Sequence, residues 1–380
     1  MMALDRLVCR RGRSLARARS DKSLARFDRI ALVLSGGGAL GAYQAGAYAA
    51  LENCGVRPNW IAGTAIGAIN AAIIAGNLPH ERIFRLRQFW QELSRRAVVR
   101  RERAVSGRLR DWLAGIIPVR SGPGRDPGHG PRGGPGRDPW RDAARDQRRR
   151  QPVVRPGELR ELVKEAVDFG RINSGAVRIV LGAVNLVTGA ETYFDNDRHV
   201  LGPDHVLAST ALPGLPPILI DDQRYGGSAV SVAALDDARP ADTLCFVVDG
   251  YDPVPGGRGG VSRSAREIAA LRRNHDLRRM IALLGERVPP GLRGDTEIKK
   301  CLAEASAATM TILHLVHEGN AEELTGKMAD FSSEAVRRRW QAGESDVATS
   351  LAHPLWLAPP PRRLGVVVHE LRGGVAAPPR

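Results

Sequence analysis

The chain has 380 residues, 43% of them hydrophobic, which suffices for one large α/β domain with an appendage or for two domains. The formal net charge of +15 is concentrated at two places: residues 1–30 hold nine Lys or Arg against three Asp, and residues 119–155 hold ten Arg against four Asp. The basic segments could contact anionic lipid headgroups or nucleic acid, but a solvated basic tail and loop is the simpler interpretation. Nucleic-acid binding is therefore not expected, and peripheral contact with an anionic membrane surface stays open.

The cysteines and the N-terminal sequence indicate the cellular compartment of the protein. Four cysteines lie far apart without a CxxC pair, which indicates free thiols in a reducing compartment and no zinc site. They are Cys9, Cys54, Cys245 and Cys301. No continuous apolar stretch precedes Arg29, so a secretory signal peptide is not expected. We expect a cytoplasmic protein whose contact with a membrane, if any, is peripheral.

The first 80 residues alternate short apolar runs with Ala-rich stretches. After a basic leader over residues 1–28, which we expect to be disordered, the pattern predicts a strand, a helix, a strand and a helix, the usual start of a parallel α/β sheet. These elements span residues 30–34, 43–52, 60–62 and 66–75. A right-handed crossover predicts that the two strands are adjacent and parallel.

Two uncharged runs in the same region, residues 30–51 and 58–79, are long enough to cross a bilayer. Glycines and polar residues inside both runs favour buried strand–loop–helix units instead.

The composition changes after the next two predicted helices, residues 81–93 and 109–117. A Gly-Pro-Gly-Arg-Asp-Pro hexapeptide at residues 122–127 recurs at residues 134–139. Such a low-complexity stretch cannot form a core, so we interpret residues 119–155 as a flexible insertion.

Regular patterns resume after the insertion. The predicted strands are residues 177–185, 191–194, 218–220, 244–248, 310–316 and 365–370. The predicted helices are residues 158–167, 205–211, 268–284, 297–308 and 331–348. Long helices dominate after residue 261, so we divide the folded chain into an α/β domain over residues 29–260 and a C-terminal helical region over residues 261–380.

A glycine-rich loop follows the first predicted strand. Its glycines are Gly36, Gly37, Gly38 and Gly41. Glycines let backbone N–H groups face one site without obstruction, so the loop is suited to an oxyanion or a phosphate. A dinucleotide site would need an acidic residue at the end of the next strand. That strand ends in Gly63, Thr64 and Ala65, and we expect no cofactor.

A second motif lies at residues 63–67 and has the frame G-x-S-x-G, with alanine in the serine position. Gly63, Thr64, Ile66 and Gly67 surround Ala65. This frame makes the sharp strand-to-helix turn, or nucleophile elbow, that exposes its central side chain.

Together the two motifs resemble the patatin-like phospholipase family, in a bacterial subgroup that carries an extra C-terminal helical domain of unknown function. Residues 182–185, 205–209 and 339–343 support the resemblance, which covers most of residues 28–372 outside the insertion. It implies a three-layer α/β/α patatin-like sandwich with a mostly parallel sheet, a helical C-terminal region, and a lipid or acyl ester ligand.

Members of this family use a Ser–Asp dyad, which is activated-nucleophile chemistry. The resemblance puts the serine at Ala65 and the aspartate at Gly226, in an element that runs from Arg224 to Leu235. No catalytic residue is then intact, although the glycine loop remains as an oxyanion hole. The sequence favours a catalytically inactive scaffold.

An active lipid acyl hydrolase with a non-standard nucleophile is the alternative. Nearby replacements are Ser35, Thr64, Ser228 and Ser231 for the serine, and Asp221, Asp222 and Asp249 for the acid. Each has a simpler interpretation as a turn or strand-end residue. His314 and His317 lack a pattern of partner carboxylates, so we interpret them as structural and predict no metal site. The sequence does not indicate an oligomeric state.

Overall fold

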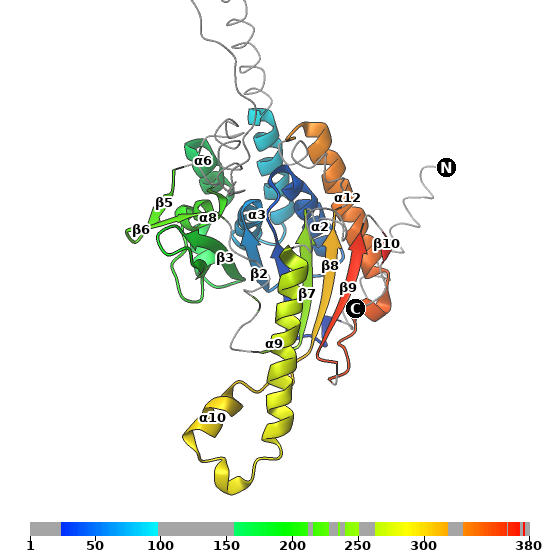
Figure 1. Ribbon diagram of the computed structural model, residues 1–380. Coiled ribbons are helices and arrows are strands. Elements are labelled where there is room, and N and C mark those ends of the chain that lie inside the picture. Colours follow the sequence, from blue (N-terminus) through cyan, green and yellow to red (C-terminus); the bar gives the residue numbers. More distant parts are fainter. Residues whose placement is uncertain are drawn as a thin grey trace, which may run out of the picture.

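A computed structural model describes residues 24–97, 156–211, 216–227, 235, 240–250, 263–317, 330–362, 364–372 and 375–376. The expected insertion, the 109–117 helix, Cys9, Ser228 and Ser231 lie outside these residues. Within them the chain forms one sheet of ten strands between two layers of helices (Figure 1), which confirms the predicted α/β/α arrangement.

The centre of the sheet is parallel. β1 (Arg29–Leu34) pairs with β2 (Trp60–Thr64), which confirms the predicted neighbours, and β1 also pairs with β7 (Thr243–Asp249). β3 (Arg178–Asn185) follows β2 in parallel. The carboxyl ends of these strands therefore meet at one edge of the sheet, where ligands bind in open α/β sheets.

Three strands form an antiparallel extension beyond β3. β6 (Gln223–Gly226) pairs with the end of β3 and with the short edge strand β5 (Ile218–Ile220), while β4 (Glu191–Asp195) pairs with the body of β3. Figure 1 shows β5 and β6 projecting at one side of the molecule.

The other side of the sheet comes from the C-terminal part of the chain. β8 (Met310–Val316) and β9 (Val366–Arg372) continue the parallel order from β7, and β10 (Val375–Ala376) pairs with β9. The residues before and after position 261 therefore share one sheet. Chain order did not reveal this, because parallel neighbours can be separated by any length of chain.

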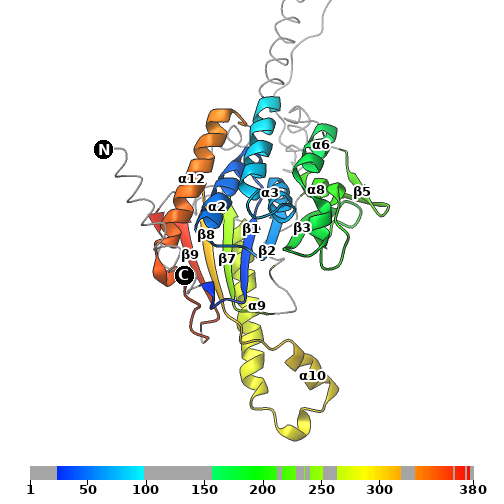
Figure 2. The same cartoon turned by 180° about the vertical axis from the view of Figure 1, so that it is seen from behind.

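One layer of helices packs on the face formed by Leu32 and Leu34 of β1. It contains α2 (Gly41–Asn53), α3 (Ile66–Ala75), a helix over residues 82–97, and α12 (Ser333–Leu351), all visible in Figure 2. Gly46 and Gly343 let α2 and α12 approach closely, because a side chain on either glycine would overlap the backbone of the other helix. Both uncharged runs thus form the expected strand–loop–helix units. None of the helices in the described ranges has the length and hydropathy needed to cross a membrane.

The opposite face, with Ala31 and Val33, is covered by α9 (Arg263–Gly285) through Ile268 and Leu271. The second half of α9 and α10 (Thr296–Ala303) extend away from the body, as Figure 1 shows. α10 is shorter than the helix predicted over residues 297–308.

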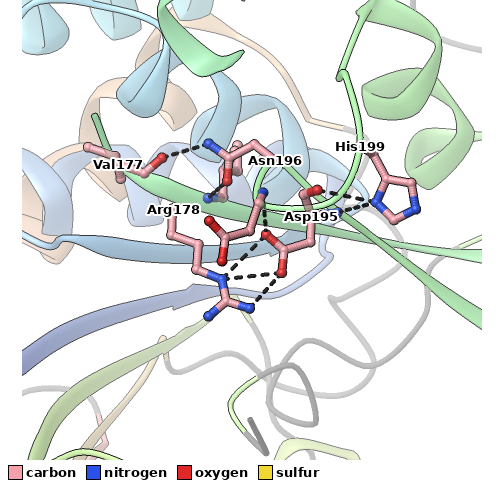
Figure 3. A network of polar contacts seen from close by, with 7 residues as sticks. Val177, Arg178, Asp195, Asn196 and His199 are labelled. Atoms are coloured by element: carbon pink, nitrogen blue, oxygen red, sulfur yellow. Dashed lines mark hydrogen bonds and ion pairs between the residues drawn. The ribbon is translucent and has the colours of Figure 1, made fainter. Parts of the chain in front are cut away.

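The smaller lobe around β3 holds α6 (Pro156–Ala166), α7 (Phe169–Asn173) and α8 (Pro203–Thr210). Figure 3 shows how the loop after β4 is fixed to the start of β3. Arg178 Nη2 lies 2.6 Å from Asp195 Oδ2, and the Asn196 amide donates to Val177 O at 2.9 Å. This network lies at the amino end of β3, away from the elbow.

The end of the basic leader is part of the fold, although the sequence predicted a disordered segment over residues 1–28. Leu24 and Phe27 are buried in the main core, and the Asp28 N–H donates to Asp242 O at 2.9 Å. Residues 24–28 therefore belong to the fold, because these two apolar side chains gain more from burial than a polar leader would.

Candidate functional site

The elbow has the backbone geometry that its glycines predict. Ala65 lies between β2 and α3 with φ 51° and ψ −125°, a conformation that few non-glycine residues adopt. A side chain on Gly63 would come within 2.5 Å of Gly67 O, and one on Gly67 would overlap Leu34 O. Both glycines are therefore required by the close approach of α3 to β1 and β2.

The glycine loop lies next to the elbow. A Cβ built on Gly36 would come 3.3 Å from Cβ of Ala65, so this glycine faces the side chain at the nucleophile position. Gly37 and Gly38 have φ of 145° and 57°, which favour glycine. No hydrogen bond of the described chain uses the N–H groups of these three glycines.

Gly41 differs from the other three loop glycines. It is the first residue of α2, and its N–H already donates to Gly38 O. A Cβ there would come 2.7 Å from Ile66 Cγ1 and 2.9 Å from Trp90 Cζ2. Gly41 therefore serves the packing of α2 against α3, and its amide is not free for a ligand.

The elbow is also held by a residue that the sequence analysis did not identify. The Ala65 N–H donates to Ser209 Oγ at 2.9 Å, and this hydroxyl donates to Gly182 O at 2.5 Å. Ser209 is buried in α8. The only signal in the sequence was its place in a segment that supported the family resemblance.

Gly226 lies at the same edge of the sheet as the elbow. It ends β6 opposite Val184 of β3, two residues beyond Gly182, which pairs with Thr64. Its φ is not positive, and a Cβ would meet Leu186 Cδ1 at 3.2 Å and Ala211 O at 3.5 Å. The position could hold a side chain but holds none.

The other candidate acids lie in an exposed hairpin turn and at the buried end of a central strand. Asp221 and Asp222 form the turn between β5 and β6 with φ of 49° and 59°, and both are exposed. Two successive positive φ values are typical of a tight hairpin turn, so these are turn residues as interpreted. Asp249 is buried at the end of β7.

Asp249 is the centre of a polar cluster beneath the glycine loop. Ser35 Oγ donates to Asp249 Oδ1, and His314 Nε2 lies 2.7 Å from Asp249 Oδ2. Burial opposes ionisation of this carboxyl, but the hydrogen bonds and charge of His314 and the bond from Ser35 lower its pKa below the usual range. The sequence hinted at this cluster only through polar residues at the ends of three apolar strands.

His317 lies beside this cluster without joining a metal site. Its N–H donates to Asp249 O at 3.1 Å, and its ring stacks on Tyr43 with centroids 4.9 Å apart. Across the described ranges no group of three His, Cys, Asp or Glu side chains is suited to a metal ion.

A buried hydrogen-bonded chain connects the loop to the helices behind it. Gln44 Nε2 donates to Ser35 O at 2.5 Å, Asn70 Nδ2 donates to Gln44 Oε1 at 3.1 Å, and Trp90 Nε1 donates to Asn70 Oδ1 at 3.0 Å. Buried polar side chains that are fully bonded make the surrounding backbone rigid.

Two family models match the chain over these elements. The model described as patatin-like phospholipase matches residues 32–251, and the model described as patatin phospholipase matches residues 261–363. No curated protein matches the chain. Among solved structures, the chain is similar to VipD from Legionella pneumophila, with 12% sequence identity and a TM-score of 0.33 over 83% of this chain and 67% of that chain.

Proposed function

Because the chain belongs to the patatin-like phospholipase family, whose model matches residues 32–251, we propose that it is a lipid-binding scaffold that does not hydrolyse esters through the family's Ser–Asp dyad. The observation that carries this proposal is that Gly36 faces Ala65: a Cβ built on Gly36 would come 3.3 Å from the Ala65 methyl, so the loop and the elbow adjoin with no nucleophile between them.

The absence of a nucleophile at position 65 is the main reason to expect no hydrolysis. The Ala65 methyl has no lone pair to attack a carbonyl carbon, although the elbow presents it in the strained geometry of the motif. Removal of a nucleophilic serine typically lowers turnover about a millionfold. Gly226 supplies no carboxylate either, so no base is available at the acid position to activate a hydroxyl there.

The amide groups of the loop support a retained binding role. Gly36, Gly37 and Gly38 have N–H groups with no hydrogen-bond partner in the described chain. All three glycines are partly exposed, so their N–H groups are open to water or to a ligand acceptor. A carboxylate or ester carbonyl oxygen is such an acceptor, which favours a fatty acid or an acyl lipid as the ligand.

The test is direct binding of a monomeric fluorescent fatty acid to the unmodified protein, together with hydrolysis of a p-nitrophenyl ester. We expect saturable binding and no hydrolysis above the buffer rate. Gly36→Val should weaken binding, because a Cβ there already comes 3.3 Å from Ala65 Cβ, whereas Gly157→Ala, on the exposed first turn of α6, serves as the control. Absence of binding by the unmodified protein would contradict the proposal.

A second candidate function rests on Ser35 and Asp249. Their hydrogen bond reproduces the Ser–Asp contact of the family's dyad one strand away from the elbow, and His314 holds the second carboxylate oxygen. In this case Ser35 Oγ would attack the acyl carbon and pass its proton to Asp249. The alcohol would leave with that proton, and water would then release the acyl group.

This second candidate predicts slow ester hydrolysis that Ser35→Ala abolishes and Ser174→Ala, in an exposed turn, leaves unchanged. A hydrolysis rate that is the same with and without Ser35 would exclude it. The first candidate remains the better supported, because Ser35 follows β1 and is not on the elbow, which presents the side chain at position 65.

The basic segments suggest where such a scaffold would act. Residues 1–30 and 119–155 carry most of the net charge of +15, and we propose that they attract the protein to anionic membranes from the cytoplasmic side. Most of both segments lies outside the described residues, and their charge is what would attract them to such a surface.

A further inference from the structure

Three exposed apolar side chains gather at the antiparallel extension beside the acid position. Leu186, Val187 and Leu219 are 53%, 72% and 63% exposed. The first two lie just after β3, and the third lies in the edge strand β5. Single exposed leucines are common, whereas neighbouring exposed apolar side chains are typical of a surface that contacts a partner or a membrane.

Strand pairing places the two leucines on the same face with an arginine between them. Leu219 is directly opposite Arg224, and the Leu186 N–H donates to Arg224 O at 2.8 Å on the other side. Residues directly opposite in antiparallel strands have side chains on the same face. We name Leu186, Arg224 and Leu219 the leucine–arginine row.

The two faces of this extension have different roles. Tyr225 points to the opposite face, where it is buried against Phe194 with ring centroids 5.1 Å apart and α8 covers the strands. An antiparallel sheet with one packed face normally presents polar residues on the other. The row presents leucines there, so its exposure is not explained by the fold.

The row adjoins the site. A Cβ on Gly226 would lie 3.2 Å from Leu186 Cδ1, so the buried acid position lies directly beside the row. A lipid that reaches the elbow from this side would pass over the leucines.

We propose that the leucine–arginine row docks the protein on a neutral phospholipid surface, with the proposed lipid-binding function as its premise. The leucines would enter the interfacial region, and the Arg224 guanidinium would bind a phosphate. Asp221 and Asp222 lie three and two residues before Arg224 and are exposed. This pairing of one cation with nearby carboxylates complements a zwitterionic headgroup, which carries a phosphate and an ammonium group.

The experiment is flotation of the full chain with phosphatidylcholine vesicles at high ionic strength, where attraction through the basic segments is screened. Leu186→Glu with Leu219→Glu should weaken binding at least about tenfold, since burial of one leucine changes a partition constant by about that factor or more. The matched control is Leu283→Glu with Leu284→Glu on the projecting part of α9, where both side chains are similarly exposed.

Three results would overturn the proposal. The first is vesicle binding by the row variant equal to that of the unmodified protein, and the second is an equal loss in the α9 control. The third is a dimer in sedimentation that the row variant dissolves, since a second copy of the chain would then cover the row.

Failure of this proposal can be separated from failure of the lipid-binding function. Binding of a monomeric fluorescent fatty acid, measured without vesicles, should be unchanged in the row variant. If the fatty acid binds but vesicles do not, only the docking surface is wrong. If the unmodified protein binds no fatty acid, the proposed function itself is wrong.

Discussion

The backbone N–H of Ala65 donates a hydrogen bond of 2.9 Å to Oγ of Ser209, a residue 144 positions later in the chain. The same hydroxyl donates to Gly182 O in β3. One buried side chain of α8 thus joins the elbow to the neighbouring strand. The strained turn at position 65 is held from outside its own motif.

We expect Ser209→Ala to lower the free energy of unfolding by about 1–3 kcal/mol, because it leaves the Ala65 N–H and Gly182 O buried without this partner. Urea denaturation measures the difference. Ser345→Ala, on the exposed side of α12, should change the stability by less than about 0.5 kcal/mol. Equal stabilities for the two variants would mean that the hydroxyl does not support the elbow.

The elbow glycines should tolerate no side chain. In Gly67→Ala the new Cβ would overlap Leu34 O and come 2.8 Å from Ser35 O, both of them backbone atoms that cannot move freely. We expect a loss of at least about 3 kcal/mol, as in severe overpacking, or failure to fold. Gly157→Ala is the control: nothing lies within 4 Å of its Cβ position in α6, so it should gain up to about 1 kcal/mol from helix propensity. Thermal unfolding of the two variants distinguishes them, and a Gly67→Ala protein as stable as the unmodified chain would contradict the close approach of α3.

The stability contributed by Asp249 should depend on pH. The pKa of this carboxyl is lowered in the folded protein, despite burial, by His314 and Ser35. Its contribution is therefore fully present above the unfolded pKa of about 4 and is lost as the pH falls through the lower folded value. Asp249→Asn should cost about 3–5 kcal/mol near neutral pH.

The difference between the unmodified protein and Asp249→Asn should shrink as the pH is lowered below about 4. Chemical denaturation at several pH values measures it. Asp221→Asn, in an exposed turn whose positive φ asparagine also accepts, should show no comparable difference. A pH-independent difference at Asp249 would mean that the carboxyl is neutral in the folded state.

The local parts of the fold were predictable from the sequence. Short apolar runs between Ala-rich stretches predicted β1, α2, β2 and α3. The two glycine motifs predicted the sharp turn at Ala65, which the structure makes with a positive φ, and the loop that faces it. Glycine patterns are informative because they report backbone conformations and close approaches that no other residue permits.

Contacts between distant segments were not predictable. Ser35 and Asp249 are 214 residues apart and meet only because β1 and β7 are neighbours in register, with Leu34 opposite Val248. Strand order in a parallel sheet cannot be read from chain order, and for the same reason β8 and β9 were assigned to a separate helical region. Burial of Leu24 and Phe27 was missed because charge dominates the composition of the segment before them.

The last prediction concerns restoration of the dyad. Ala65→Ser alone should give little ester hydrolysis, because an unassisted serine hydroxyl is a poor nucleophile at neutral pH. Adding Gly226→Asp places a carboxylate in β6, where the backbone accepts a side chain and the nearest obstacle is the flexible end of Leu186 at 3.2 Å. A general base contributes about 10²–10⁴-fold, so the double variant should exceed Ala65→Ser by at least about a hundredfold in kcat/KM.

Hydrolysis of p-nitrophenyl butyrate by the four proteins measures this effect, with Gly226→Asp alone as the control that has a base but no nucleophile. The gain requires the new carboxylate to lie within about 2.6–3.2 Å of the new hydroxyl. β3 lies between β2 and β6, so an aspartate side chain at position 226 must reach across one strand. The strand register favours this, because Gly226 pairs with β3 only two residues beyond the residue that pairs with Thr64. If the double variant is no faster than Ala65→Ser, Gly226 is not the acid position. If the unmodified chain is as fast as the double variant, the nucleophile lies elsewhere, and Ser35 beside Asp249 becomes the first residue to replace.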